Sequence, residues 1–296
     1  MPVLKMHSKN GIIGLFKEEI GLKITTIGIQ YGVFYNIVFS PHNIRAIAMK
    51  DLIFFDANCS LGKNEHGQGV HKDELLKDMD YFGVDKALVR SFMKFQNAVY
   101  TNDYIAKAVR GEERLVGVWC ILPDQCDEVP KPDDFFAQMK ENNIGAITLL
   151  PELHRFLPNR LTIGRIMDAA AERRVPVLLD GFKGKWKEMY EFMATFPNNV
   201  FLSMSASGKW GTDRNIRPLL ENYPNFYFEL MGYWVPEGIY DLAEKYGADR
   251  IIYGSGFPTM DQGSPMLQLK QSRLDNEAIA KIAGGNLENI LKGAQL

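Results

Sequence analysis

The chain has 296 residues, 46% of them hydrophobic, and a formal net charge of −2 at pH 7. That length can bury one large core. The near-balanced charge gives no sign of a nucleic acid or an anionic membrane as partner. Three cysteines without Cys-x-x-Cys spacing argue against a disulfide framework or a structural zinc site. No apolar stretch reaches the roughly 20 residues of a spanning helix. We therefore expect a cytoplasmic protein.

Residues 1–50 differ in pattern from the rest of the chain. Residues 22–39 are rich in β-branched and aromatic side chains and are followed by Pro41. This N-terminal extension could be a hairpin that packs on the following domain, or an arm in a homo-oligomer. It could also be a leader that is not native, because Met49 starts a segment that reads as a natural beginning. The sequence leaves these alternatives open.

From residue 51 to residue 296, short apolar runs alternate with segments of helical spacing. Eight runs predict strands: residues 52–58, 86–91, 115–121, 145–150, 175–180, 200–204, 225–230 and 250–255. The runs are continuous rather than alternating, which is typical of strands buried on both faces. Eight strands, most of them followed by a helix, predict a single α/β domain, a (β/α)8 TIM barrel. An open doubly wound sheet is the alternative.

Five motifs in this part of the chain resemble those of the amidohydrolase superfamily, in its amidohydrolase-related branch. They are residues 56–62 at the first strand, 81–87 before the second, 175–181 at the fifth, 254–258 after the eighth, and 285–291 in the last helix. The resemblance extends over about residues 50–294. It implies the TIM-barrel fold and a hydrolase whose site lies at the carboxyl ends of the strands.

The resemblance also implies a divalent metal site, whose ligands this chain lacks. Family members use His-x-His on strand one, His on strands five and six, and Asp on strand eight. Those positions here hold Asn58, Ser60, Asp180, Ser205 and Gly256. Zinc needs three or four imidazole, thiolate or carboxylate ligands, and only Asp180 qualifies. Oxygens of Asp56, Asn58 and Asp180 would make at best a weak site for a harder cation. We expect no metal and no other cofactor.

Polar residues at the strand ends form a candidate site, because ligands of such barrels bind there. Asp56 and Asn58 share parity, so both are expected to face the interior. Together with Arg90, which ends the second strand, they are predicted to bind substrate. Asp180 and Glu229, at the ends of strands five and seven, are candidate catalytic acids or bases. For Asp56, Arg90 and Asp180 the alternative is a structural role in ion pairs or backbone hydrogen bonds.

The loops after the strands add basic, aromatic and histidine side chains. Lys183, Lys209, Trp210 and Trp234 follow strands five, six and seven. They predict binding of a small anionic organic molecule with an apolar or ring portion. The alternative is an ordinary solvated surface. His154 follows strand four and is the third catalytic candidate, with a solvated loop histidine as its alternative.

The sequence thus favours a metal-independent hydrolase of a small carboxylated substrate, such as a lactone or an amide. Arg90 and the loop lysines would hold the carboxylate, while Asp180 or Glu229 would activate water. Two alternatives stay open. One is a non-catalytic binding barrel that has lost the ancestral metal site. The other is a metal-dependent hydrolase or decarboxylase with unusual ligands.

Overall fold

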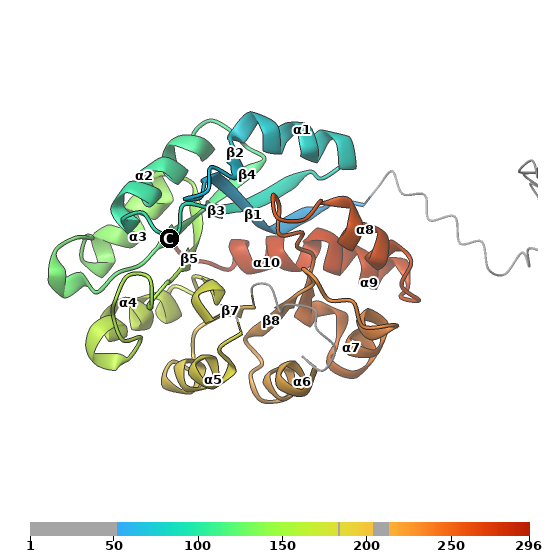
Figure 1. The fold of residues 1–296 in the computed structure, drawn as a ribbon. Helices are drawn as coiled ribbons and strands as arrows, with labels where there is room; N and C mark the ends of the chain where they lie inside the picture. Colours follow the sequence, from blue (N-terminus) through green and yellow to red (C-terminus); the bar gives the residue numbers. More distant parts are fainter. Residues whose placement is uncertain (1–51, 183, 204–212) are drawn as a thin grey trace, which may run out of the picture. The chain divides into compact units, whose positions relative to one another are not determined.

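The computed structural model describes residues 52–182, 184–203 and 213–296, and all of them belong to the compact unit Asp51–Leu296. Within these ranges nine strands form one sheet in the order β2-β1-β3-β4-β5-β6-β7-β8-β9 (Figure 1). The strands are β1 Phe55–Lys63, β2 Gly69–Val70, β3 Lys86–Ser91, β4 Leu115–Cys120, β5 Ile144–Thr148, β6 Val177–Leu178, β7 Phe201–Leu202, β8 Phe226–Glu229 and β9 Ile251–Ile252. The short β2 pairs antiparallel with β1, and every other pairing is parallel.

Helices connect successive strands and lie around the sheet in a ring (Figure 1). They are α1 Lys72–Phe82, α2 Ala98–Val109, α3 Pro132–Glu141, α4 Arg160–Glu172, α5 Trp186–Thr195, α6 Asp213–Asn222, α7 Gly238–Tyr246, α8 Gly263–Lys270, α9 Asn276–Ala280 and α10 Asn286–Lys292. A π-helical turn, Lys281–Gly285, joins α9 to α10. Parallel neighbours need such crossover connections. Among the described residues, no helix combines the length and the apolar composition that crossing a membrane requires.

Local sequence sets the ends of the helices, as α1 illustrates. The backbone N–H of His71 donates to Glu74 Oε2 at 2.9 Å, which caps the first turn. Leu75 and Met79, four residues apart, form the buried face. Gly83 adopts φ 76° and ends the helix, a left-handed conformation that costs glycine little.

The ring closes between β1 and the chain that follows β9. Ala57 N donates to Tyr253 O at 3.0 Å, and Ser60 N donates to Phe257 O at 2.8 Å. These bonds join the first and the last parallel strands, so the open sheet is excluded. The predicted TIM barrel is confirmed. The predicted strands near residues 175–180, 200–204 and 250–255 exist, but each pairs over only two residues.

Alternation along the strands places polar side chains above an apolar plug. The interior is filled by Phe55, Ala57, Leu88, Val118, Ala146, Leu178, Leu202 and Ile252. Side chains two residues apart on a strand share a face. The next inward positions on β3 and β5, and the one just past β6, are therefore Arg90, Thr148 and Asp180, at the carboxyl ends of the strands, where barrel sites lie.

A register shift in β1 separates Asp56 from Asn58. From Asp56 to Cys59, β1 advances three residues while β3 advances two, as in a β-bulge. Asp56 consequently faces Gln262, whose Nε2 donates to its carboxylate at 2.9 Å, whereas Asn58 faces Arg90. The expectation that Asp56 and Asn58 share a face assumed a regular strand, and for Asp56 it is wrong.

Candidate functional site

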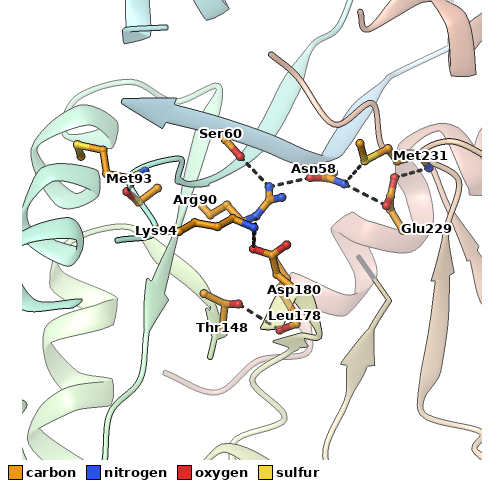
Figure 2. A network of polar contacts seen from close by, with 11 residues as sticks. Asn58, Ser60, Arg90, Met93, Lys94, Thr148, Leu178, Asp180, Glu229 and Met231 are labelled. Carbon is orange, nitrogen blue, oxygen red and sulfur yellow. Dashed lines mark hydrogen bonds and ion pairs between the residues drawn. The ribbon is translucent and has the colours of Figure 1, made fainter. Parts of the chain in front are cut away.

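Arg90 lies at the centre of a polar network across the barrel mouth (Figure 2). Arg90 is the last residue but one of β3, and its side chain is 10% exposed. Nη1 donates to Asn58 Oδ1 at 2.7 Å and to Ser60 Oγ at 2.8 Å, and Nε donates to Asp180 Oδ2 at 3.3 Å. A buried cation requires such partners. The hydrogen bonds to Asn58 and Ser60 at Nη1, together with the one to Asp180 at Nε, hold the guanidinium in one orientation.

Asp180 carries two positive neighbours. Lys94 Nζ lies 2.6 Å from the same Oδ2 that Arg90 contacts. Burial by itself would raise the pKa of Asp180, but the charges of Arg90 and Lys94 outweigh it. The pKa of this carboxyl therefore lies well below its usual range. A carboxylate stabilised in this way is a weak base.

Glu229, at the end of β8, lies on the other side of Arg90. Its Oε2 accepts a hydrogen bond from Asn58 Nδ2 at 3.1 Å, and its Oε1 accepts one from Met231 N at 2.6 Å. Asn58 and Glu229 are both fully buried. The two predicted carboxylates, Asp180 and Glu229, are thus linked through Arg90 and Asn58 in one chain of contacts (Figure 2).

Two glycines after β9 leave room for this chain of contacts. A Cβ at Gly254 would overlap Glu229 Oε1, and one at Gly256 would overlap the thioether of Met231. Gly256 also has φ 82°, which other residues rarely adopt. A side chain at Gly256, the position at which the resembled family places a metal-binding Asp, would therefore require Met231 to move.

A small pocket opens beside Arg90, with a volume of about 20 Å³. Its polar lining includes Arg90, Lys94, Asn102, Thr148, His154 and Asp180. A volume of about 10–15 Å³ holds one water molecule, so this pocket admits one or two water-sized groups. Two cations therefore border a space suited to a group of carboxylate size.

His154 lies in this pocket, as its position after β5 predicts. Its Nδ1 is 3.6 Å from Cys120 Sγ, and its Nε2 is buried without a hydrogen-bond partner among the described residues. Burial lowers the pKa of His154, although the backbone of Gln96 opposes the shift. The imidazole is therefore neutral at neutral pH. Burial raises the pKa of the Cys120 thiol to about 12, so Cys120 carries no thiolate there.

The remaining predicted residues do not reach this pocket or lie outside the described chain. Trp234 is 50% exposed and lines a separate surface groove beside Tyr240, at the start of α7. Asp56 bonds to Gln262 and does not line the pocket. Outside the described residues lie Lys183, Ser205, Lys209 and Trp210.

Several residues of the site were not among the predicted ones, namely Lys94, Asn102, Cys120, Thr148 and Met231. Lys94 follows Arg90 by four residues in the sequence. A second cation so close to a buried arginine near a strand end could have predicted that both contact the same anionic group. Cys120 and Met231 belong to residue types that usually fill cores, so the sequence contains no comparable signal for them.

A family model described as amidohydrolase matches residues 74–291. This range extends from α1 into α10 and covers most of the chain. The chain belongs to the amidohydrolase family. No protein with a curated function matches this amidohydrolase-family chain in sequence.

Several solved structures have the same fold as this chain, although their sequence identity to it is low. A TIM-barrel protein of Bordetella bronchiseptica, titled uncharacterised, is 15% identical with a TM-score of 0.60, over 82% of this chain and 99% of its own. The 5-carboxyvanillate decarboxylase of Novosphingobium aromaticivorans is 13% identical with a TM-score of 0.63, over 82% and 96%. The 2,6-dihydroxybenzoate decarboxylase of Rhizobium is 12% identical with a TM-score of 0.59, over 81% and 99%. Such identities show the fold alone.

The Novosphingobium structure holds manganese together with 4-hydroxy-3-methoxy-5-nitrobenzoic acid, so the fit of a metal to this chain can be tested. The oxygens at the resembled positions are those of Asn58, Ser60 and Asp180, and each already contacts the Arg90 guanidinium. Within the described ranges, no three His, Cys, Asp or Glu side chains are arranged to hold a metal ion. A site with one carboxylate and a resident cation does not fit a divalent metal.

Proposed function

We propose that this amidohydrolase-family protein binds a small carboxylated substrate at Arg90 and Lys94 and hydrolyses it without a divalent metal. The observation that carries the proposal is the cation pair itself. Asp180 holds Arg90 and Lys94 at 3.3 and 2.6 Å in a pocket that also contains the neutral His154. A carboxylate can replace water there and accept charge-assisted hydrogen bonds.

The charges that border the pocket support an anionic ligand. Among the residues that line the pocket, Arg90 and Lys94 are cationic and Asp180 is anionic, while the carboxylate of Glu229 lies outside the lining, behind Asn58. Nη1 and Nε of Arg90 are engaged by the network, whereas its Nη2 bonds to none of the residues that the structure describes. That Nη2 edge is available to one carboxylate oxygen.

His154 is the residue that we assign to proton transfer. Once the imidazole, which lines the pocket, turns its buried Nε2 toward that space, this atom can accept a proton from a water molecule that attacks the carbonyl carbon of a lactone or an amide. The same proton then passes to the leaving oxygen or nitrogen when the tetrahedral intermediate collapses. Asp180, a weak base beside two cations, holds those cations in place. These steps require no cofactor.

The test is a hydrolysis screen on protein purified with a chelator. The panel consists of small lactones and amides, each with and without a free carboxylate, and every reaction is repeated with chelator and with added Mn²⁺. We expect turnover of carboxylated members that is unchanged by chelator and that falls at least about 100-fold in His154→Gln. Turnover that appears only with added Mn²⁺ would contradict the proposal.

One observation favours a second candidate, a barrel that binds a carboxylate without turnover. The pairing of Asp180 with Arg90 and Lys94 weakens one of the three predicted acid–base groups. Calorimetric binding without product in any arm of the screen would indicate this binding role. Release of CO₂ in the Mn²⁺ arm would instead indicate a decarboxylase, the activity that the Novosphingobium and Rhizobium structures are named for.

A further inference from the structure

We propose that Asn58 and Glu229 form a positioning pair that fixes the guanidinium of Arg90 for its ligand. The inference rests on the proposed function in one respect, namely that Arg90 contacts the carboxylate of the substrate. It assigns to Glu229 a role different from that of a catalytic acid or base: Glu229 acts on Arg90 through the side-chain amide of Asn58.

Hydrogen-bond polarity supports this assignment. A guanidinium can only donate and an ionised carboxylate can only accept, whereas an amide does both through different atoms. Asn58 presents Oδ1 to Arg90 at 2.7 Å and Nδ2 to Glu229 at 3.1 Å. A flipped amide would place its NH₂ against the guanidinium and its oxygen against the carboxylate. Glu229 therefore favours the same orientation of the Asn58 amide that Arg90 requires, and its contact with Nδ2 holds the amide there.

Burial and packing hold Glu229 in this role. The Glu229 side chain is fully buried and does not line the pocket beside Arg90. Its Oε1 accepts from Met231 N, and its backbone N donates to Ser203 Oγ at 3.0 Å. The absence of a side chain at Gly254 leaves the space that the Glu229 carboxylate occupies. The pair thus lies behind Arg90 as seen from the pocket.

The consequence concerns the free edge of Arg90. With Nη1 held by Asn58 and Ser60, and Nε by Asp180, the Nη2 edge has one fixed direction. Without the amide acceptor, the guanidinium can turn toward Asp180, its remaining charged partner in this network. Carboxylate affinity then falls although Arg90 is still present and still charged.

A polarity swap tests this coupling. Asn58→Asp sets two carboxylates about as far apart as the present 3.1 Å contact, so we expect affinity for small carboxylates to fall about tenfold or more. Glu229→Gln leaves an amide whose NH₂ can also turn toward Asn58, so the Asn58 amide is held less firmly and affinity should fall about threefold, less than in Asn58→Asp. In the double variant Asn58→Asp/Glu229→Gln, the new amide donates to the new carboxylate, which again accepts from Arg90, so affinity should return. The control is Glu288→Gln, which changes a partly exposed ion pair with Lys86 outside this network and should leave affinity unchanged.

Two further measurements separate positioning from a purely structural effect. In protein labelled with ¹⁵N-arginine, the side-chain N–H signals of Arg90 should shift or broaden in Asn58→Asp and return in the double variant, without any ligand. Lower pH should also restore affinity in Asn58→Asp, because a proton shared by the two carboxylates removes their repulsion.

The outcomes distinguish this inference from the proposed function. If wild type binds no carboxylate, the proposed function fails, and the Arg90 signals of the four proteins still decide the inference. If Asn58→Asp does not fold, recovery of folding in the double variant supports the pair. An equally impaired or unfolded double variant would overturn it, as would a wild-type Arg90 signal in Asn58→Asp.

Discussion

Arg90 bonds to side chains at three of the positions that metal-dependent members of the resembled family use as ligands: Asn58, Ser60 and Asp180. A guanidinium attracts anions and aligns them, but it has no empty orbital with which to polarise a bound water. A site built from these residues suits the recognition of a carboxylate, which is the role that we propose for it. Proton transfer must then come from a side chain, and His154 is the one that we propose.

Asp180→Asn should destabilise the fold, because it removes the negative charge of the buried side chain that Arg90 and Lys94 both contact. We expect a loss of about 3 kcal/mol in the free energy of unfolding near pH 7, measured by urea denaturation. The control is Asp168→Asn, whose pair with Arg160 is about half exposed and should cost less than about 1 kcal/mol. Equal costs for the two variants would contradict the buried-pair account.

The pH dependence of that loss follows from the lowered pKa of Asp180. A carboxyl whose folded-state pKa is depressed contributes stability above its unfolded value of about 3.9. The difference between wild type and Asp180→Asn should therefore be complete above about pH 5 and shrink as pH falls toward the folded pKa. A difference that is constant from pH 7 to pH 2 would mean that the Asp180 charge is not involved.

In the pH profile of the hydrolysis rate, protonation of His154 should cause the fall on the acid side, and this fall should occur at low pH. A base is active when unprotonated, and burial lowers the pKa of His154. The rate should thus stay level down to below about pH 6.5, the ordinary imidazole value, and fall only at lower pH. His154→Gln should remove this fall. A fall that persists at the same pH in His154→Gln would assign it to another group.

At the scale of elements, the positions of the strands could be predicted from the sequence, whereas their register and the side-chain contacts between them could not. Continuous apolar runs predicted all eight parallel strands, and β3 coincides with residues 86–91 because Lys86 and Ser91 bound its apolar core. The bulge of β1 could not be predicted from periodicity, because register depends on the neighbouring strand. Asp56 was misplaced for that reason. The positions of Arg90, Asp180 and Glu229 at or just past the ends of their strands were predictable, whereas β1 continues from Asn58 to Lys63. The pairing of these residues across the barrel was not predictable.

The segment after β9 contains a packing contact between distant parts of the chain, in which Gly256 lies against the side chain of Met231. Gly256→Ala should cost more than a left-handed alanine alone, because its Cβ meets Met231. Gly111→Ala is the matched control, with φ 72° and no atom near the new Cβ. We expect a loss of about 1 kcal/mol for Gly111→Ala and an additional 1–3 kcal/mol, roughly, for Gly256→Ala in urea denaturation. Met231→Ala should relieve the additional part. Equal losses for the two glycines would contradict the packing seen here.

At the scale of the whole molecule, the amidohydrolase-family barrel is retained while the residues at its mouth differ from the resembled metal site. A fold does not determine its chemistry, which depends on a few side chains at the strand ends. The assignment of residues 1–50 as an N-terminal extension to a barrel domain of residues 51–296 stays a prediction, as does the formation of a homo-oligomer.

The central claim is that Arg90 binds a small carboxylate without a metal, and calorimetric titration tests it most directly. Chelator-treated wild type, Arg90→Ala and the exposed-site control Arg160→Ala are titrated with small dicarboxylates at fixed ionic strength. Truncation of a buried charged contact costs about 2–5 kcal/mol, so Arg90→Ala should bind well over tenfold more weakly, while Arg160→Ala binds like wild type. Equal affinity in wild type and Arg90→Ala would mean that Arg90 is only a structural partner of Asp180, and it would contradict the account.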